Sequence, residues 1–161
     1  MFGKRVHALL FVSIILFVAM GGCNKRHIPN TEILDNDFNR EIIDQTERYR
    51  HAVEDINIGL LMTLASPRYF DNSGTTTGDD DMDRAGLEQM LKERFGALQS
   101  VRYEMKYLAI YEQHGVVYVE YTYTMSFQYK VDDSTRWYNK TADNRLEMEA
   151  VDDGYLIISG M

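Results

Sequence analysis

Cys23 is the only cysteine in the chain, and it stands at the foot of an apolar segment. Lys4 and Arg5 form a short basic head, the residues from Ala8 to Met20 are apolar except for one serine, and two glycines precede the thiol. A positive head, a short apolar core and small residues at the cut site are typical of a secretory signal. The apolar run is shorter than the roughly 20 residues that a permanent membrane span requires. The sequence therefore predicts an exported protein.

The residues Met20-Gly21-Gly22-Cys23 resemble the lipobox of bacterial lipoproteins. The resemblance implies a signal peptide over residues 1–22 and a mature chain that begins at an acylated Cys23. Two or three acyl chains would hold the protein on a bilayer, because each buried methylene contributes about 0.8 kcal/mol. Asn24 is not the aspartate that retains some of these proteins in the inner membrane, which favours the outer membrane of the cell envelope. An uncleaved anchor and ordinary secretion with a free thiol are the alternatives.

Three aspartates, Asp79, Asp81 and Asp83, have the one-three-five spacing of a calcium-binding EF-hand loop. The rest of that pattern is missing, because Arg84 stands where the loop needs glycine and Met90 where it needs glutamate. We therefore expect a solvated loop in which Asp83 or Asp81 caps the helix that follows. We predict no metal site and no cofactor.

The histidines after Cys23 are far apart in the predicted fold. His27 belongs to the segment that follows the cysteine, His51 lies off the apolar stripe of a predicted helix, and His114 lies in a predicted turn. These positions do not indicate a metal triad, and we expect the three imidazoles to be solvated.

Helical periodicity dominates the first half of the chain. Residues 35–65 are predicted to form one long helix, capped near Asn36, because apolar residues recur every three or four positions. Ser66 and Pro67 end it, and the sequence "SPRYFD" predicts a short second helix. A polar loop and a third helix over residues 83–98 follow. The apolar stripe of the long helix consists of Phe38, Ile42, Tyr49, Val53, Ile56, Leu60 and Leu64.

From Val101 the apolar period changes to two, which predicts an antiparallel meander. A first strand leads to a tight turn at His114 and Gly115, and residues 117–131 form the clearest strand. The third strand covers residues 135–151 with a break near residues 140–144, and a short strand closes the chain. Helices followed by strands predict an α+β layer fold in which the helices cover one face of the sheet.

Composition limits the classes of partner. The net charge is −8, and an acidic surface argues against binding to nucleic acid or to anionic lipid, which requires a basic patch. With a single cysteine the chain cannot form an internal disulfide bond, and its stability must come from the core. Residues 23–34 read as the lipidated cysteine and a polar tether. At about 3.5 Å per residue, residues 24–34 would reach about 40 Å from the membrane.

The order of elements, with the phrases "LASPRYFD", "DRAGLEQMLKERF" and "RLEMEAVDDGYLIISGM", resembles the nuclear transport factor 2-like superfamily, also called SnoaL-like or cystatin-like. The resemblance assigns residues 35–161 to one such domain. It implies a cone of three N-terminal helices packed on a curved antiparallel sheet of about four strands, with a pocket at the wide end. Members include isomerases, dehydratases and cyclases as well as binding and dimerisation modules, so the fold alone does not choose a function.

The resemblance makes residues that face the cone the candidate site. An isomerase or cyclase needs a general base and a donor for the developing oxyanion. Along residues 117–131, the predicted inward face carries neither an acid nor a histidine, and no catalytic residue is identified. Tyrosine hydroxyls remain as hydrogen-bond donors, and Asp71 and Tyr69 lie near where the family's pocket opens. The candidate pocket residues are Tyr69, Asp71, Tyr103, Tyr107, Tyr121, Tyr123 and Tyr129.

These observations predict an extracytoplasmic lipoprotein, bound to the membrane through Cys23. Its domain is expected to bind a small apolar ligand or to act as an interaction module. A homodimer through the open face of the sheet is a further expectation, with Tyr118, Thr122, Thr124 and Ser126 at the contact. An isomerase-, cyclase- or dehydratase-type enzyme and a structural envelope component with a filled cone are the alternatives.

Overall fold

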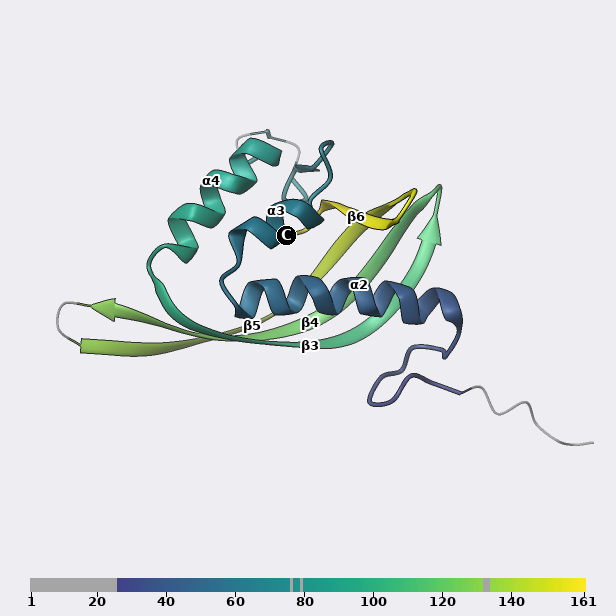
Figure 1. The fold of residues 1–161 in the computed structure, drawn as a ribbon, viewed down its shortest axis with the longest axis horizontal. Helices are drawn as coiled ribbons and strands as arrows, with labels where there is room; N and C mark the ends of the chain where they lie inside the picture. The colour runs from purple at the N-terminus through teal and green to yellow at the C-terminus, as the bar shows by residue number, and fades with distance from the viewer. Residues whose placement is uncertain (1–25, 76, 79, 132–133) are drawn as a thin grey trace, which may run out of the picture.

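The computed structural model describes residues 26–161 apart from 76, 79, 132 and 133 (Figure 1). The predicted signal over residues 1–22 and the acceptor Cys23 lie outside the described residues. The elements in chain order are α2 (Asp37–Glu54), α3 (Ile58–Leu64), β1 (Phe70–Asp71), β2 (Met82–Asp83), α4 (Arg84–Phe95), β3 (Leu98–Gln113), β4 (Val116–Val131), β5 (Ser134–Val151) and β6 (Gly154–Ser159).

The long helix predicted over residues 35–65 is wrong, because the chain breaks into α2 and α3 at residues 55–57. Asn36 caps α2 as expected, accepting a hydrogen bond from the Asn39 amide at 2.8 Å. At the break Ile56 takes a left-handed φ of 52°, and the Asn57 side chain caps α3 by accepting from the Leu60 amide. The apolar spacing continues across this break, so periodicity alone conceals it.

The short helix predicted over residues 66–71 is also wrong. Ser66 and Pro67 begin a turn in which the Tyr69 amide donates to the Ser66 carbonyl at 3.0 Å. Phe70 and Asp71 then form β1, which pairs antiparallel with β2. The third predicted helix is confirmed as α4, and Asp83 caps it by accepting from the Gly86 amide at 2.8 Å.

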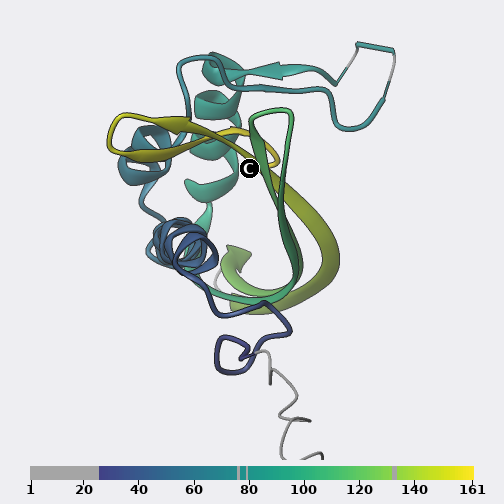
Figure 2. The same ribbon diagram turned by 90° about the vertical axis from the view of Figure 1, so that its right-hand side faces the viewer.

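Four antiparallel strands form the main sheet in the order β3-β4-β5-β6. The turn at His114 and Gly115 is confirmed, and both residues have positive φ, as tight hairpin turns require. The predicted break at residues 140–144 is absent, since β5 pairs with β4 without interruption from Ser134 to Glu149. A register shift between Tyr107 and Ala109 interrupts the β3–β4 ladder. Such bulges increase twist and bend a sheet, and Figure 2 shows the sheet curling around the helices.

The core lies between the concave face of the sheet and the helices. Helix α2 lies along β3, where the Tyr103 amide donates to Glu54 at 3.1 Å and the Tyr107 hydroxyl donates to Glu47 at 2.6 Å. The fully buried apolar side chains come from α2, α3, α4 and the strands β4, β5 and β6. They include Ile42, Leu61, Leu87, Val119, Tyr121, Leu146, Met148 and Ile157. The structure confirms the predicted α+β class with three helices on a curved sheet.

The segment before α2 is folded into a loop and is therefore shorter than the extended tether predicted from the sequence. Residues 26–35 form a small loop, closed by hydrogen bonds from the Asp35 amide to the Arg26 carbonyl and from the Ile28 amide to the Ile33 carbonyl. Ile33 is buried against the domain. None of the helices within the described residues is long and apolar enough to span a membrane.

Candidate functional site

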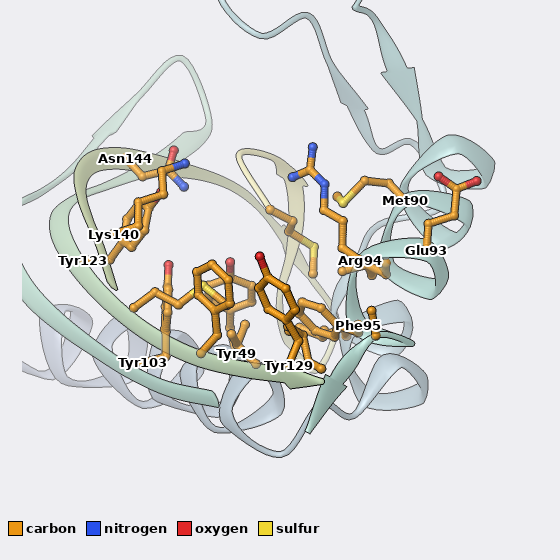
Figure 3. A pocket seen from close by; sticks show the side chains of 18 residues that line it. Tyr49, Met90, Glu93, Arg94, Phe95, Tyr103, Tyr123, Tyr129, Lys140 and Asn144 are labelled. Atoms are coloured by element: carbon orange, nitrogen blue, oxygen red, sulfur yellow. The ribbon is translucent and has the colours of Figure 1, made fainter. Parts of the chain in front are cut away.

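A pocket of about 520 Å³ opens between α4 and the concave face of the sheet. Figure 3 shows its lining side chains, which are largely aromatic and aliphatic. Its inner end meets α2 and α3 at Tyr49 and Leu61, and its outer end follows the β4–β5 hairpin. The apolar and aromatic wall consists of Tyr49, Val53, Leu61, Met90, Leu91, Phe95, Ala97, Leu98, Tyr103, Tyr123, Met125, Phe127, Tyr129 and Met161.

The tyrosines at the inner end of the pocket form an interacting cluster. Tyr49 packs edge-on against Tyr103 with 6.3 Å between ring centroids, and Tyr103 stacks on Tyr123 at 5.4 Å. Burial is the main cause that raises the pKa of Tyr49, Tyr103 and Tyr121, and their hydroxyl groups also influence one another. These phenols therefore stay protonated near neutral pH and offer neutral hydrogen-bond donors.

Asn144, on β5, connects residues at the inner end of the pocket by hydrogen bonds. Its side-chain amide donates to the Tyr121 hydroxyl at 3.0 Å and to the Gly160 carbonyl at 2.9 Å. Gly160 has a φ of 91°, and a Cβ at this position would collide with the Arg145 carbonyl oxygen. Only glycine fits so close to the neighbouring backbone. This packing holds the end of the chain in place, so that Met161 forms part of the pocket wall.

Tyr69 and Asp71 lie behind this wall and do not line the pocket. The Asp71 carboxylate accepts from the Gly160 amide at 2.8 Å, and the Tyr69 hydroxyl accepts from the Met161 amide at 3.2 Å. Burial, together with the Asp71 charge, raises the pKa of Tyr69. The two residues therefore position the last residues of the chain around the pocket.

Of the remaining candidate tyrosines, some line the pocket and others do not. Tyr103, Tyr123 and Tyr129 line the pocket, and Tyr121 supports it through Asn144. Tyr107 does not line it, because its hydroxyl donates to Glu47 on α2, and burial and this bond raise its pKa. Three of the five candidate sheet tyrosines therefore lie in the pocket wall, Tyr103 from β3 and Tyr123 and Tyr129 from β4.

Among the described residues, the pocket offers hydrogen-bond donors but no buried side chain that could act as a general base. Within the described residues, its lining contains no histidine or aspartate, and Glu93 supplies its one side-chain carboxylate. Figure 3 shows that carboxylate turned away from the hollow on α4. Nor do three His, Cys, Asp or Glu side chains meet as a metal site anywhere in the described part of the chain. Asp79, part of the acidic cluster, lies outside the described residues. The arrangement can bind and orient a molecule.

Comparisons with known proteins identify the fold. No protein-family model and no curated protein matches the chain. Among solved structures, a proposed dehydratase of the NTF2-like family from Streptomyces avermitilis superposes with a TM-score of 0.64 at 9% identity, covering 76% of this chain and 92% of that one. A nuclear transport factor 2 (NTF2)-like superfamily protein from Salmonella enterica gives 0.60 at 13%, covering 75% and 86%. The chain has the nuclear transport factor 2-like fold.

A third similar structure is that of a complex. It is a protein from Catenulispora acidiphila in complex with S-DNPA, and it superposes with a TM-score of 0.59 at 17% identity, covering 77% of this chain and 90% of that one. At such identities the likeness shows the nuclear transport factor 2-like fold alone. The activity of this chain must be argued from its own pocket.

Sequence reasoning missed several pocket residues of this nuclear transport factor 2-like fold. Lys140 and Asn144 fell in the expected strand break, although their alternation with Leu146 and Met148 places them on one face. Arg94 was not among the candidate residues, but it is exposed and reaches the pocket from α4. Tyr49 was recognised as apolar core, and its spacing carried no signal that it would meet Tyr103.

Proposed function

We propose that the protein binds a small, largely apolar ligand in the pocket between α4 and the sheet. We further propose that lipid on Cys23 holds this binding domain on the extracytoplasmic face of a membrane. The observation that carries the binding function is the pocket itself, with about 520 Å³ of space behind an aromatic wall. Ligand pockets of proteins have volumes of roughly 300–1,000 Å³ and are lined mainly by apolar groups with a few polar ones.

The lining favours a ligand with a flat apolar body and a hydrogen-bond acceptor. Rings of Tyr103, Tyr123 and Tyr129 offer stacking surfaces. Protonated phenols at the inner end can donate to a carbonyl or ether oxygen. The space also counts against the alternative of a cone filled by its own side chains.

Catalysis receives less support than binding. The tyrosine cluster could stabilise an oxyanion, as an isomerase or dehydratase requires. However, the pocket residues that the structure describes include no carboxylate or imidazole directed into the hollow. A general base must lie within hydrogen-bond reach of the proton that it removes. We therefore propose binding without turnover.

A neutral fluorescent probe tests the binding function. N-phenyl-1-naphthylamine brightens in apolar surroundings, and we expect it to bind the purified domain with saturation. Met125 and Ser126 are neighbours on β4, but only Met125 lines the pocket. Met125→Trp should fill the space and remove most of the fluorescence gain, whereas the matched control Ser126→Trp should keep it. Circular dichroism checks that both variants fold. Absence of saturable binding to the wild type, or equal loss in both variants, would contradict the proposal.

A further inference from the structure

The pocket differs in charge from the protein that surrounds it. The chain has a net charge of −8, yet two cationic side chains, Arg94 and Lys140, line the pocket against the single side-chain carboxylate of Glu93. Figure 3 shows the Arg94 side chain extending over the hollow from α4, while the Glu93 carboxylate points to the far side. Lys140 lies across the hollow beside Tyr123. The mouth of the pocket is therefore locally cationic.

Neither cation is used for a structural ion pair. Among the side chains that the structure describes, Arg50, Arg68 and Arg145 each bind a glutamate, but no carboxylate lies within 4.0 Å of Arg94 or Lys140. The Lys140 ammonium instead lies 5.7 Å from the ring centroid of Tyr123. A cation over an aromatic ring keeps most of its hydrogen-bonding capacity. Both groups remain able to bind an anion that enters the pocket.

The position of Lys140 follows from strand register. Lys140 pairs with Met125 on β4, and Met125 lines the pocket, so the two side chains lie on the same face. The same alternation places Arg136, which pairs with Tyr129, on this face. The aromatic wall of the pocket thus has cationic residues along its β5 edge and Arg94 opposite.

Building on the proposed binding function, we propose that the pocket selects amphipathic organic anions. The flat apolar body lies against Tyr123 and Tyr129, and a carboxylate or sulfonate head group lies at the mouth between Arg94 and Lys140. The planar guanidinium of arginine can bind both oxygens of such a head group, and the lysine ammonium adds a point charge. Glu93 does not cancel this field, because its carboxylate is turned away.

Two dyes with the same ring system test this selectivity. Anilinonaphthalene sulfonate is an anion, and N-phenyl-1-naphthylamine is its neutral counterpart without the sulfonate. We expect the wild type to bind the anion more tightly. Arg94→Gln and Lys140→Gln should each lower the affinity for the anionic dye by about three- to tenfold, the range expected for one partly exposed ion pair. Both variants should weaken binding of the neutral dye less than binding of the anion.

Lys106→Gln is the matched control, because it removes one positive charge from an exposed side chain on the outer face of β3. It should leave both affinities unchanged. Equal affinity of the wild type for the two dyes would overturn the anion selectivity while the binding function stands. If Arg94→Gln or Lys140→Gln lowered the affinity for both dyes equally, the effect would be structural, and the anion selectivity would also be overturned. If neither dye binds, the binding function and the selectivity are overturned together.

Discussion

Five tyrosines illustrate how the interior of this protein treats ionisable groups. Burial is the main cause that raises the pKa of Tyr49, Tyr69, Tyr103, Tyr107 and Tyr121. Their phenols stay neutral when folded, so Tyr107 donates a hydrogen bond to Glu47, and Tyr49 and Tyr103 are neutral groups in the pocket wall. The positions and spacing of these tyrosines were visible in the sequence. Which hydroxyl would meet Glu47 and which would meet the pocket depended on contacts with α2 that lie far away along the chain.

This burial predicts loss of stability at alkaline pH. An unfolded tyrosine ionises near pH 10, whereas these folded tyrosines hold their protons above it. Their contribution is fully present below about pH 10 and is lost as the pH rises towards the folded pKa values, because the unfolded chain then binds fewer protons. We expect the free energy of unfolding, measured with urea, to fall above about pH 10.

Tyr107→Phe supplies the comparison, since Tyr107 lies outside the pocket and removing its hydroxyl deletes one raised pKa. Its unfolding free energy should fall less steeply with pH than that of the wild type. A stability that stays level from about pH 9 to 11 would contradict the prediction.

At the scale of elements, the sequence predicted the strands better than the helices. Alternation along residues 117–131 was long and regular, and β4 follows it. The division into α2 and α3 was missed, because Val53, Ile56 and Leu60 keep helical spacing across the break while Asn57 begins a new cap. The reading of "SPRYFD" as a helix failed for another reason. Phe70 and Asp71 pair with β2, and this partner is distant in sequence.

Helix α4 depends on its cap, and the sequence left two candidates for it. Asp83 accepts from the Gly86 amide at 2.8 Å and also pairs with Phe70 across β1 and β2. We expect Asp83→Ala to lower the free energy of unfolding by about 1 kcal/mol, the usual cost of losing a cap. Asp81→Ala, an exposed change in the same loop, is the control and should have little effect. Urea unfolding measures both, and equal losses would show that Asp83 is not the cap.

The whole molecule combines a predicted lipid anchor with a nuclear transport factor 2-like fold. The fold class was predictable, because the order of helices and strands follows from two periods in the sequence. The anchor remains a prediction, since Cys23 lies outside the described residues. A homodimer through the outer face of the sheet also remains a prediction. On that face, Thr122 donates to Asp143 at 2.7 Å and Thr124 lies 3.2 Å from Thr141.

The anchor is tested on the full-length protein in a bacterial host. We expect mass spectrometry of the membrane-extracted protein to find acyl chains on Cys23 and no trace of residues 1–22. Cys23→Ser should move the protein out of the membrane fraction, because about 0.8 kcal/mol per buried methylene is then lost. Recovery of the unprocessed chain, or unchanged membrane association of Cys23→Ser, would contradict lipidation.

The aromatic wall of the pocket does not stop where the pocket does. Tyr129 stacks on Tyr138 with 4.7 Å between ring centroids, and Phe127 stacks on the same ring at 5.9 Å. Tyr138 lies on the β4–β5 hairpin, which extends past the helices (Figure 1). A binding site that is closed at both ends limits the length of its ligand. This pocket is closed at its inner end, and its aromatic wall continues along the hairpin at its outer end. A ligand of the proposed kind could therefore vary in length at the outer end of the pocket.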